Sequence, residues 1–384
     1  MSGAQERIET KLVHAGEPRP RIAGAVEMPI FQSATYEYAG EGSYHDVRYL
    51  RTNNTPTQLA LHAKLAALEG AEAALVTASG MAAISTTLLA LLSAGEHLLA
   101  QRCLYGGTHD LLTRDFARFG LSADFIDADR SDSWRAQLRP STRAIYVEAM
   151  TNPLLEVADL RAVVQFARAH GLISIIDNTF ASPINFRPIE AGFDLVLHSA
   201  TKYLNGHADI VAGAVAGSAA LIERIRHKAN HLGGSLDPHA GFLLNRGLKT
   251  LALRVRWQNE SALTIARFLA AQPGVARVYY AGLESHPRHE RAASLFAGFG
   301  GVLSFELEGE AARADEFAAR VRIPAVAPSL GGVHTLLTRP TTTSHAGLTR
   351  EERLRVGIRD GLLRLSVGIE ATEDLLEDFA QALR

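Results

Sequence analysis

The sequence predicts an α/β protein: a mainly parallel seven-stranded sheet with helices on both faces, followed by a smaller C-terminal α+β domain. Two observations lead to this prediction. Between residues 56 and 245, short runs rich in branched apolar residues alternate with longer stretches at helical spacing. These runs are apolar throughout and do not alternate with polar residues, so both faces of the sheet should be buried, as in parallel sheets.

Each expected element has its place in this alternation. The predicted strands are residues 74–77, 97–100, 123–127, 144–148, 172–176, 195–198 and 212–216. The predicted covering helices are residues 56–68, 80–93, 107–119, 159–170 and 219–230. Ligands of such sheets bind beyond the carboxyl ends of the strands, so residues that directly follow a strand are the first candidates for a site.

The chain differs in character on either side of this region. Residues 1–55 carry prolines and glycines with little periodicity, which predicts an arm that lies on a neighbouring subunit. Residues 56–245 form the predicted sheet domain, and a long helical pattern at 238–271 leads into the predicted C-terminal domain, 246–384. In that domain we expect strands at 275–280, 301–307 and 362–366, and helices at 288–296, 310–321, 350–356 and 372–382.

Composition and charge exclude several classes of protein. The 384 residues are 47% hydrophobic, enough for a sizeable core, and the formal net charge of −2 provides no bulk field for nucleic acid or an anionic membrane. The single cysteine, Cys103, excludes an internal disulfide and fits a reducing compartment. The first residues lack an apolar signal region and the longest apolar-rich run, 84–92, is too short to span a bilayer, so we expect a cytoplasmic protein.

Two strand ends carry the most informative residues. One apolar run ends in Ser199, Thr201 and Lys202, and Asp177 ends the predicted strand before it. Small hydroxyls beside a lysine can hold a phosphate and present an amine. A lysine for a Schiff base and an aspartate for a pyridinium nitrogen are what a protein supplies to pyridoxal phosphate, PLP. Each residue alone also fits a surface lysine or a helix N-cap, but both segments together predict a PLP site.

Other candidate residues have two interpretations each. Ser79 and Gly80 open a helix after a strand, where free N–H groups attract an anion, or Ser79 is a plain N-cap. Arg364 lies inside an apolar strand, so it should meet a carboxylate of the protein or of an amino-acid substrate. The remaining candidates are Tyr105 (ring stacking or core), Asn152 (hydrogen-bond donor or turn) and Arg51 (phosphate fork or solvated charge).

Eight short segments occur in a characteristic order: Ser79-Gly-Met-Ala-Ala-Ile84, Tyr105-Gly-Gly-Thr108, Thr151-Asn-Pro153, Asp177-Asn-Thr-Phe180, His198-Ser-Ala-Thr-Lys-Tyr203, Arg246-Gly-Leu-Lys-Thr-Leu251, Ser329-Leu-Gly-Gly332 and Arg364-Leu-Ser-Val-Gly-Ile-Glu370. With these segments the chain, from about residue 28 onward, resembles the Cys/Met-metabolism family of PLP enzymes. This trans-sulfuration family includes cystathionine γ-synthase, cystathionine γ- and β-lyases, methionine γ-lyase and O-acylhomoserine sulfhydrylases.

The resemblance implies a type I PLP-enzyme fold, a homotetramer built from dimers with shared sites, and a role for each candidate. Lys202 would form the Schiff base and move the Cα proton, Asp177 would pair with the pyridine nitrogen, and Tyr105 would stack on the ring. Tyr105 or Lys202 would serve as acid–base group in the later steps. The other implied contacts are Ser79, Gly80, Met81, Ser199 and Thr201 at the phosphate, Tyr49 and Arg51 reaching it from a neighbouring subunit, Asn152 at the cofactor hydroxyl, and Arg364 with Ser329 at the substrate carboxylate.

Departures from the family pattern bear on the reaction. Gly107 stands where methionine γ-lyases have a cysteine, which argues against that enzyme. Asp110 stands where an arginine usually faces the distal carboxylate of cystathionine, and Pro328 replaces a glutamate. If Asp110 faces the pocket and not solvent, a cationic or neutral γ-substituent such as that of canavanine is favoured. We therefore predict a PLP-dependent γ-lyase acting on cystathionine or a canavanine-like substrate; γ-replacement and β-elimination stay open as alternatives.

Overall fold

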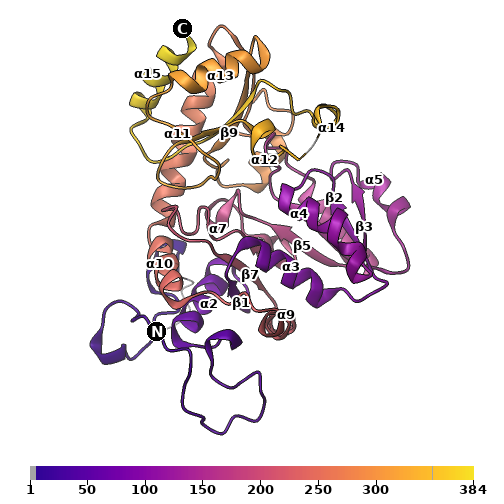
Figure 1. The fold of residues 1–384 in the computed structure, drawn as a ribbon, viewed down its shortest axis with the longest axis vertical. Helices are drawn as coiled ribbons and strands as arrows, with labels where there is room; N and C mark the ends of the chain where they lie inside the picture. The colour runs from indigo at the N-terminus through magenta and orange to yellow at the C-terminus, as the bar shows by residue number, and fades with distance from the viewer. Residues whose placement is uncertain (1–5, 348) are drawn as a thin grey trace.

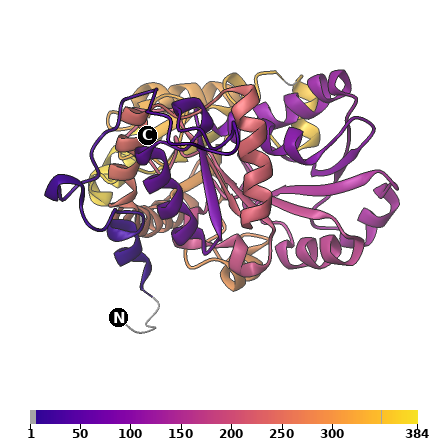
Figure 2. The same cartoon turned by 90° about the horizontal axis from the view of Figure 1, so that it is seen from below.

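The computed structural model describes residues 6–347 and 349–384, in which a large sheet carries helices on both faces and a smaller sheet packs above it (Figures 1 and 2). The large sheet has seven strands in the order β1-β7-β6-β5-β4-β2-β3. Their bounds are β1 (Ala73–Thr77), β2 (His97–Gln101), β3 (Ser122–Ile126), β4 (Thr142–Glu148), β5 (Ile173–Asp177), β6 (Leu195–His198) and β7 (Gly213–Gly217). β7 is antiparallel to β1 and β6, and the other pairs are parallel. The predicted mainly parallel seven-stranded sheet is confirmed.

The apolar character of the strands follows from burial on both faces. In β4, Ile145 and Val147 enter one core cluster, whereas Ala144 and Tyr146 enter a second cluster on the other face. The first face is covered by α2 (Pro56–Glu69) and α6 (Leu160–His170), and the second by α3 (Gly80–Leu91) and α9 (Ala219–Leu232). The remaining short helices are α5 (Ser131–Trp134), α7 (Ser182–Asn185) and α8 (Pro188–Ala191), with 3₁₀ turns at Ile22–Gly24, Leu50–Thr52, Arg135–Gln137 and Pro340–Thr342.

Two of the predicted helices are less regular than expected. Residues 106–119 form α4 (Gly106–Asp110), a short π-helix (Leu111–Asp115) and a 3₁₀ turn (Phe116–Phe119). The helical pattern predicted at 238–271 forms two helices, α10 (Pro238–Leu248) and α11 (Leu251–Ala270), with a break between them. The buried Arg254 guanidinium donates to the Gly247 carbonyl at 2.8 Å, an oxygen that a continuous helix would give to the N–H four residues on.

The C-terminal region forms a five-stranded sheet in the order β10-β11-β12-β9-β8. Its strands are β8 (Val275–Tyr279), β9 (Val302–Leu307), β10 (Ala325–Val326), β11 (Leu336–Thr338) and β12 (Leu362–Ser366). Its helices are α12 (His289–Leu295), α13 (Glu310–Arg320), α14 (Arg350–Arg355) and α15 (Thr372–Leu383), all close to the predicted ranges. The prediction missed β10 and β11, which are too short to show a periodicity.

The arm is more structured at its start than predicted. The helix α1 (Ile8–His14) buries Leu12, whose carbonyl oxygen accepts a hydrogen bond from Lys64 Nζ at 2.9 Å. The arm after it is irregular and protrudes from the body in Figure 1. Within the described residues, no helix combines the length and apolarity that a bilayer crossing requires. Residues 1–5 of the predicted arm lie outside the described residues, and the domain boundaries stay predictions.

Candidate active site

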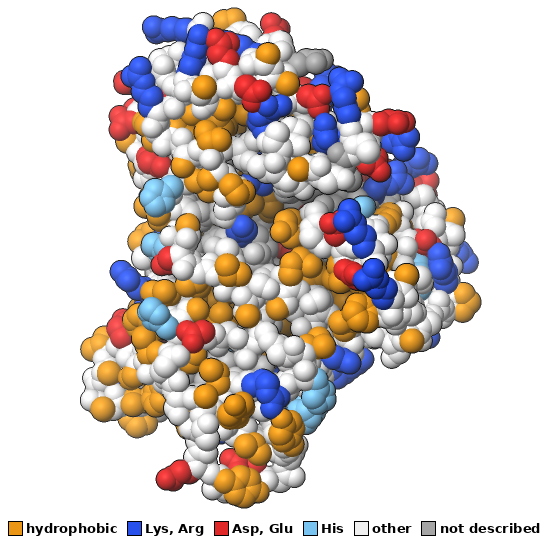
Figure 3. Space-filling view, viewed as in Figure 1, with side chains coloured by type: hydrophobic (Ala, Val, Ile, Leu, Met, Phe, Trp, Pro, Cys, Tyr) orange, Lys and Arg blue, Asp and Glu red, His pale blue; other side chains and the backbone are white. Residues whose placement is uncertain are grey.

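A cavity of about 700 Å³ opens where the strand ends of the large sheet meet the C-terminal domain. Figure 3 shows this face of the molecule, hollowed between the C-terminal domain at the top and the body below. All but three of the predicted site residues line the cavity: Ser79, Gly80, Met81, Tyr105, Asn152, Asp177, Ser199, Thr201, Lys202, Ser329 and Arg364. The topology therefore brings together residues as far apart in the chain as Ser79 and Arg364.

Lys202 presents a nucleophilic amine to the cavity. It lies in the turn that follows β6, and its backbone N–H donates to the Ser199 carbonyl at 3.0 Å. Its Nζ donates to Ser329 Oγ at 2.8 Å, which fixes the amine across from the C-terminal sheet. Burial, with the nearby Arg364 charge as a second cause, lowers the pKa of Lys202 to about 8. The uncharged amine is thus accessible close to neutral pH.

Asp177 ends β5 and is the register partner of Glu148 at the end of β4. Burial raises the pKa of both carboxyls, and that of Glu148 is raised well above its usual range because the Asp177 charge adds to the effect. The Thr179 N–H donates to Asp177 Oδ1 at 2.9 Å and favours the ionised form of Asp177. The two carboxyls therefore disfavour each other's charge, and the Thr179 hydrogen bond favours Asp177 over Glu148 as the one that carries it.

Glu148 lines the cavity but was not among the predicted site residues. Its Oε1 accepts a hydrogen bond from the Tyr105 backbone N–H at 2.6 Å. The sequence contained a signal for it, because Glu148, like Asp177, is a carboxylate that ends an apolar run. Glu148 thus anchors the backbone of the tyrosine that precedes α4.

Tyr105 lies at the start of α4 with 47% of its surface exposed and lines the cavity. Gly107 leaves room for the ring: a Cβ at this position would lie 2.7 Å from Tyr105 Cε1 and 3.0 Å from Met81 Sδ. A cysteine at position 107 would therefore displace the ring or Met81. An exposed aromatic face beside a buried carboxylate suits a planar heterocycle.

The N-terminus of α3 forms an anion cradle with the turn after β6. Ser79 caps the helix, and its Oγ accepts from the Ala82 N–H at 3.0 Å. The first N–H groups of the helix have no intrahelical partner, and the helix dipole is positive at this end. A Cβ at Gly80 would lie 2.9 Å from Ser199 Oγ, so the absence of a side chain keeps the cradle open. The Thr201 hydroxyl is held by the Ala212 backbone at 2.9 and 3.1 Å.

Arg364 on β12 supplies a buried positive charge on the other side of the cavity. It donates to Asn152 Oδ1 at 3.0 Å and to the Ser329 carbonyl at 2.8 Å, both neutral oxygens. Its buried Nε lacks a hydrogen-bond partner among residues 6–347 and 349–384. Burial lowers the pKa of Arg364 to about 10, so the charge is retained at neutral pH. A substrate carboxylate is the partner that this guanidinium fits.

Three predicted residues do not line the cavity. Asp110 is 55% exposed and pairs with Arg114 at 3.4 Å on the outer side of α4, so the structure gives no support to its predicted role in a distal pocket. Tyr49 and Arg51 lie in the arm, where Arg51 donates to the Asn230 carbonyl of α9 at 2.5 Å. Their predicted contact with a neighbouring subunit stays a prediction.

The cavity offers an amine, a buried carboxylate, an aromatic face, an anion cradle and a guanidinium. These groups match the Schiff-base, pyridine, ring and phosphate parts of PLP and the carboxylate of an amino acid. The open cradle at Gly80 and the unpartnered Arg364 Nε are the observations on which this fit rests.

Comparisons with known proteins agree with this fit. The profile of a family described as Cys/Met metabolism PLP-dependent enzyme matches residues 9–384. The chain is 43% identical to cystathionine gamma-lyase of Bacillus subtilis (strain 168), over 98% of both chains. It is also 43% identical to cystathionine beta-lyase of Lactococcus lactis subsp. cremoris (strain MG1363), over 98% of both. Among solved structures, cystathionine gamma-lyase from Lactobacillus plantarum complexed with L-serine superimposes with a TM-score of 0.93 at 38% identity, over 98% of both chains.

Proposed function

Because the chain belongs to the Cys/Met-metabolism family of PLP-dependent enzymes, we propose that it is a lyase that cleaves the γ-carbon–sulfur bond of L-cystathionine. The observation that carries the proposal is the contact of Ser329 with both Lys202 and Arg364. This contact brings an amine with a lowered pKa and a guanidinium that can bind a carboxylate close enough to act on the same substrate molecule. An α-amino acid has both of the groups that they would meet. Two relatives at 43% identity are named as cystathionine lyases, which supports cystathionine as the substrate.

Different residues would contact different parts of the cofactor. Lys202 would bind PLP covalently, Asp177 would pair with its ring nitrogen, and Tyr105 would cover the ring face. The α3 cradle with Ser79, Gly80, Met81, Ser199 and Thr201 would hold the phosphate, and Asn152 would contact the ring hydroxyl. When bound, PLP supplies an electron sink for the bonds at the substrate Cα. An ionised Asp177 would sustain that sink, because it would keep the ring nitrogen protonated.

The same residues account for the proton transfers. Arg364 would orient the substrate by its α-carboxylate, so that the Cα proton faces Lys202. The Ser329 hydroxyl, 2.8 Å from Lys202 Nζ, would hold the displaced amine in place to take that proton. Removal of a Cβ proton then allows the γ-sulfur to leave, with Tyr105 or Lys202 as the acid–base group. Each such transfer by a placed side chain accelerates the reaction by about 10² to 10⁴.

Product analysis distinguishes the proposed reaction from its alternatives. γ-Elimination from cystathionine yields cysteine, ammonia and 2-oxobutanoate, whereas β-elimination yields homocysteine, ammonia and pyruvate. Purified protein with PLP and cystathionine should therefore form 2-oxobutanoate, and Lys202→Ala should form neither keto acid. Pyruvate as the main product would make the protein a β-lyase.

A second candidate is γ-replacement, as in cystathionine γ-synthase or an O-acylhomoserine sulfhydrylase. The observation that favours it is the hydroxyl-rich wall of the cavity at Thr343 and Ser344. They lie in Thr341-Thr-Thr-Ser-His345, which resembles the threonine-rich segment of sulfhydrylases. An O-acylhomoserine with and without a thiol tests it, because replacement requires the thiol and forms a thioether without ammonia. Canavanine belongs in the same assay, although the exposed Asp110 gives it no support.

We also propose a cytoplasmic homotetramer built from dimers, in which Tyr49 and Arg51 contribute to the phosphate site of the neighbouring subunit. Exposed apolar side chains on the arm support an intersubunit role: Val26 (70%), Tyr38 (71%) and Tyr44 (57%). Sedimentation of the active protein should show a dimer or tetramer. A fully active monomer would contradict this assembly.

A further inference from the structure

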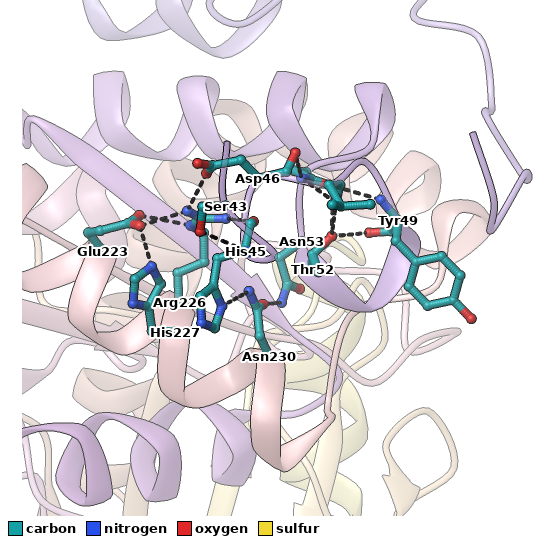
Figure 4. A network of polar contacts seen from close by, with 12 residues as sticks. Ser43, His45, Asp46, Tyr49, Thr52, Asn53, Glu223, Arg226, His227 and Asn230 are labelled. Carbon is teal, nitrogen blue, oxygen red and sulfur yellow. Dashed lines mark hydrogen bonds and ion pairs between the residues drawn. The ribbon is translucent and has the colours of Figure 1, made fainter. Parts of the chain in front are cut away.

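The polar side of α9 faces the arm, and the contacts between them form the network in Figure 4. Towards the sheet, α9 buries Ile222, Ile225 and Ala229. The opposite stripe has helical spacing and consists of Glu223, Arg226, His227, Asn230 and His231. We call these five residues the α9 anchor.

Arg226 holds the arm by its backbone. It donates to the His45 carbonyl at 2.7 Å and pairs with Asp46 at 3.4 Å. Glu223, one turn earlier in α9, accepts from Arg226 Nε at 2.8 Å. Arg226 Nη2 also donates to Glu223, at 2.6 Å, so the guanidinium is oriented by its own helix at two points and directs Nη1 at the arm.

Asn230 holds the arm on both sides of Tyr49. Its side-chain amide lies 3.3 Å from His45 Nδ1 and 3.1 Å from the Asn53 amide nitrogen. Its backbone carbonyl accepts from Arg51 at 2.5 Å. The α9 anchor therefore holds the His45 backbone before Tyr49, the Asn53 side chain after it, and the Arg51 guanidinium itself.

Three imidazoles meet within this contact. The ring of His45 stacks on His227 with centroids 4.0 Å apart and planes at 17°, and contacts His231 edge-on at 5.3 Å. Two protonated rings at 4 Å repel each other, and His227 Nε2 has a carboxylate partner in Glu223 at 2.7 Å, so the proton that the docked arm disfavours is the one on His45. Desolvation first, and then the charges of His227, His231 and Arg226, lower the pKa of His45; Glu223 opposes them.

We propose that the α9 anchor positions Arg51 and Tyr49 for the cofactor phosphate of a neighbouring subunit, and that it releases the arm when His45 takes up a proton. The proposal rests on the proposed function in one respect, the phosphate role of Arg51. Arg226 and Asn230 are positioning residues, because they act on the phosphate only through the arm.

The sign of the pH effect follows from the surroundings of His45. Its pKa is lower in the docked arm than the usual histidine value of about 6.5, so the docked arm binds fewer protons and acid favours release. One linked proton changes the docking equilibrium by at most about tenfold per pH unit below this value. On the arm itself, Tyr44 contacts the His45 ring and Asp46 pairs with Arg226. His62 of α2, also near Arg226, stays uncharged because burial lowers its pKa to about 3.

Hydrogen exchange of the arm in the PLP-loaded protein, measured by mass spectrometry and corrected for intrinsic rates, tests the anchor. For residues 43–53 we expect faster exchange at pH 5.5 than at pH 7.5, by up to about tenfold. Arg226→Gln should expose the arm at both pH values, and His45→Phe, which keeps a ring that cannot titrate, should remove the pH dependence. Arg224→Gln is the matched control, because Arg224 lies on the same helix but contacts the Ala90 carbonyl at 3.4 Å. Equal exchange at both pH values in the wild type, or an Arg226→Gln arm as protected as the control, would overturn the proposal.

The affinity for PLP tests the positioning role separately. We expect Arg226→Gln to raise the PLP dissociation constant at least about fivefold, and Arg226→Lys to recover part of the loss. A loosened arm with unchanged PLP affinity would overturn the positioning role. Arg51→Gln separates this from the proposed function, since unchanged PLP affinity in that variant would refute the phosphate contact itself, whatever the exchange of the arm.

Discussion

Substitutions of Glu148 test the division of charge between the two buried carboxyls of the site. Burial and the Asp177 charge raise the pKa of Glu148 well above its usual range, and its Oε1 accepts from the Tyr105 N–H at 2.6 Å, whereas the Thr179 hydrogen bond favours a charge on Asp177. Glu148→Gln keeps both the acceptor oxygen and the neutral charge. Glu148→Ala removes the acceptor and leaves the N–H without a partner.

The expected magnitudes follow from these contacts. An unpaired N–H costs about 1–3 kcal/mol when buried, and since Tyr105 is half-exposed, the lower part of this range applies, about 1–2 kcal/mol. Glu148→Ala should thus lower kcat/KM by about five- to thirtyfold, and Glu148→Gln by no more than about threefold. Asp177→Asn is the contrast on the neighbouring strand. Loss of a desolvated charge partner costs about 2–5 kcal/mol, at least about thirtyfold in kcat/KM.

Stability provides an independent readout of the same assignment. The pKa of Glu148 is raised in the folded state, so its contribution to stability is present below the unfolded pKa and is lost as pH rises towards the folded pKa. Glu148→Gln removes this loss. The midpoint of urea unfolding of the variant, relative to wild type, should therefore be higher at pH 8 than at pH 5. A Glu148→Gln variant as impaired as Glu148→Ala, with no such pH trend, would refute the neutral assignment.

Further substitutions and conditions test other parts of the site. The rate at which PLP-free protein captures PLP should rise about tenfold from pH 6 to pH 7 and level off above pH 8, because the pKa of Lys202 is lowered to about 8 and only the uncharged amine attacks; a rise continuing to pH 10 would contradict it. Arg364→Lys keeps the charge but loses the fork, so KM for the amino acid should rise about ten- to hundredfold while the PLP absorbance is retained. Gly107→Ala should weaken PLP binding about tenfold in a titration, since the methyl group would overlap the Tyr105 ring, and unchanged affinity would show that the ring can move. Asp110→Asn should change the ratio of kcat/KM between cationic and neutral substrates less than about twofold, because its ion pair is exposed.

The sequence predicted what depends on local pattern and on the geometry common to parallel sheets. The strand that precedes Lys202 is a continuous apolar run, and its turn residues identify its end. Because the carboxyl ends of neighbouring parallel strands lie at the same edge of the sheet, the sequence is enough to expect Asp177 and Lys202 at one site. Their meeting in one cavity follows from the pairing of β5 with β6.

What depends on contacts between distant segments could not be predicted. The break between α10 and α11 involves the buried guanidinium of Arg254, which donates a hydrogen bond to the Gly247 carbonyl of the preceding helix. Glu148 and Asp177 look alike in the sequence, and only the register of β4 against β5 shows that they are partners. Asp110 could face the pocket or solvent by helical spacing alone, and only the structure shows that its carboxylate is exposed and pairs with Arg114.

Ser329 shows how the two sheets make one site. Its φ of 106° lies in the left-handed region, which costs a non-glycine residue about 1–3 kcal/mol unless the surroundings hold it. Arg364 donates to its carbonyl and Lys202 to its hydroxyl, so the strained residue is fixed from both sheets at once. Movement of the C-terminal sheet would therefore shift the carboxylate site and the amine together. Since a proton transfer at Cα requires both to be aligned within fractions of an ångström, the strain at Ser329 is consistent with a site whose geometry is set before the substrate arrives.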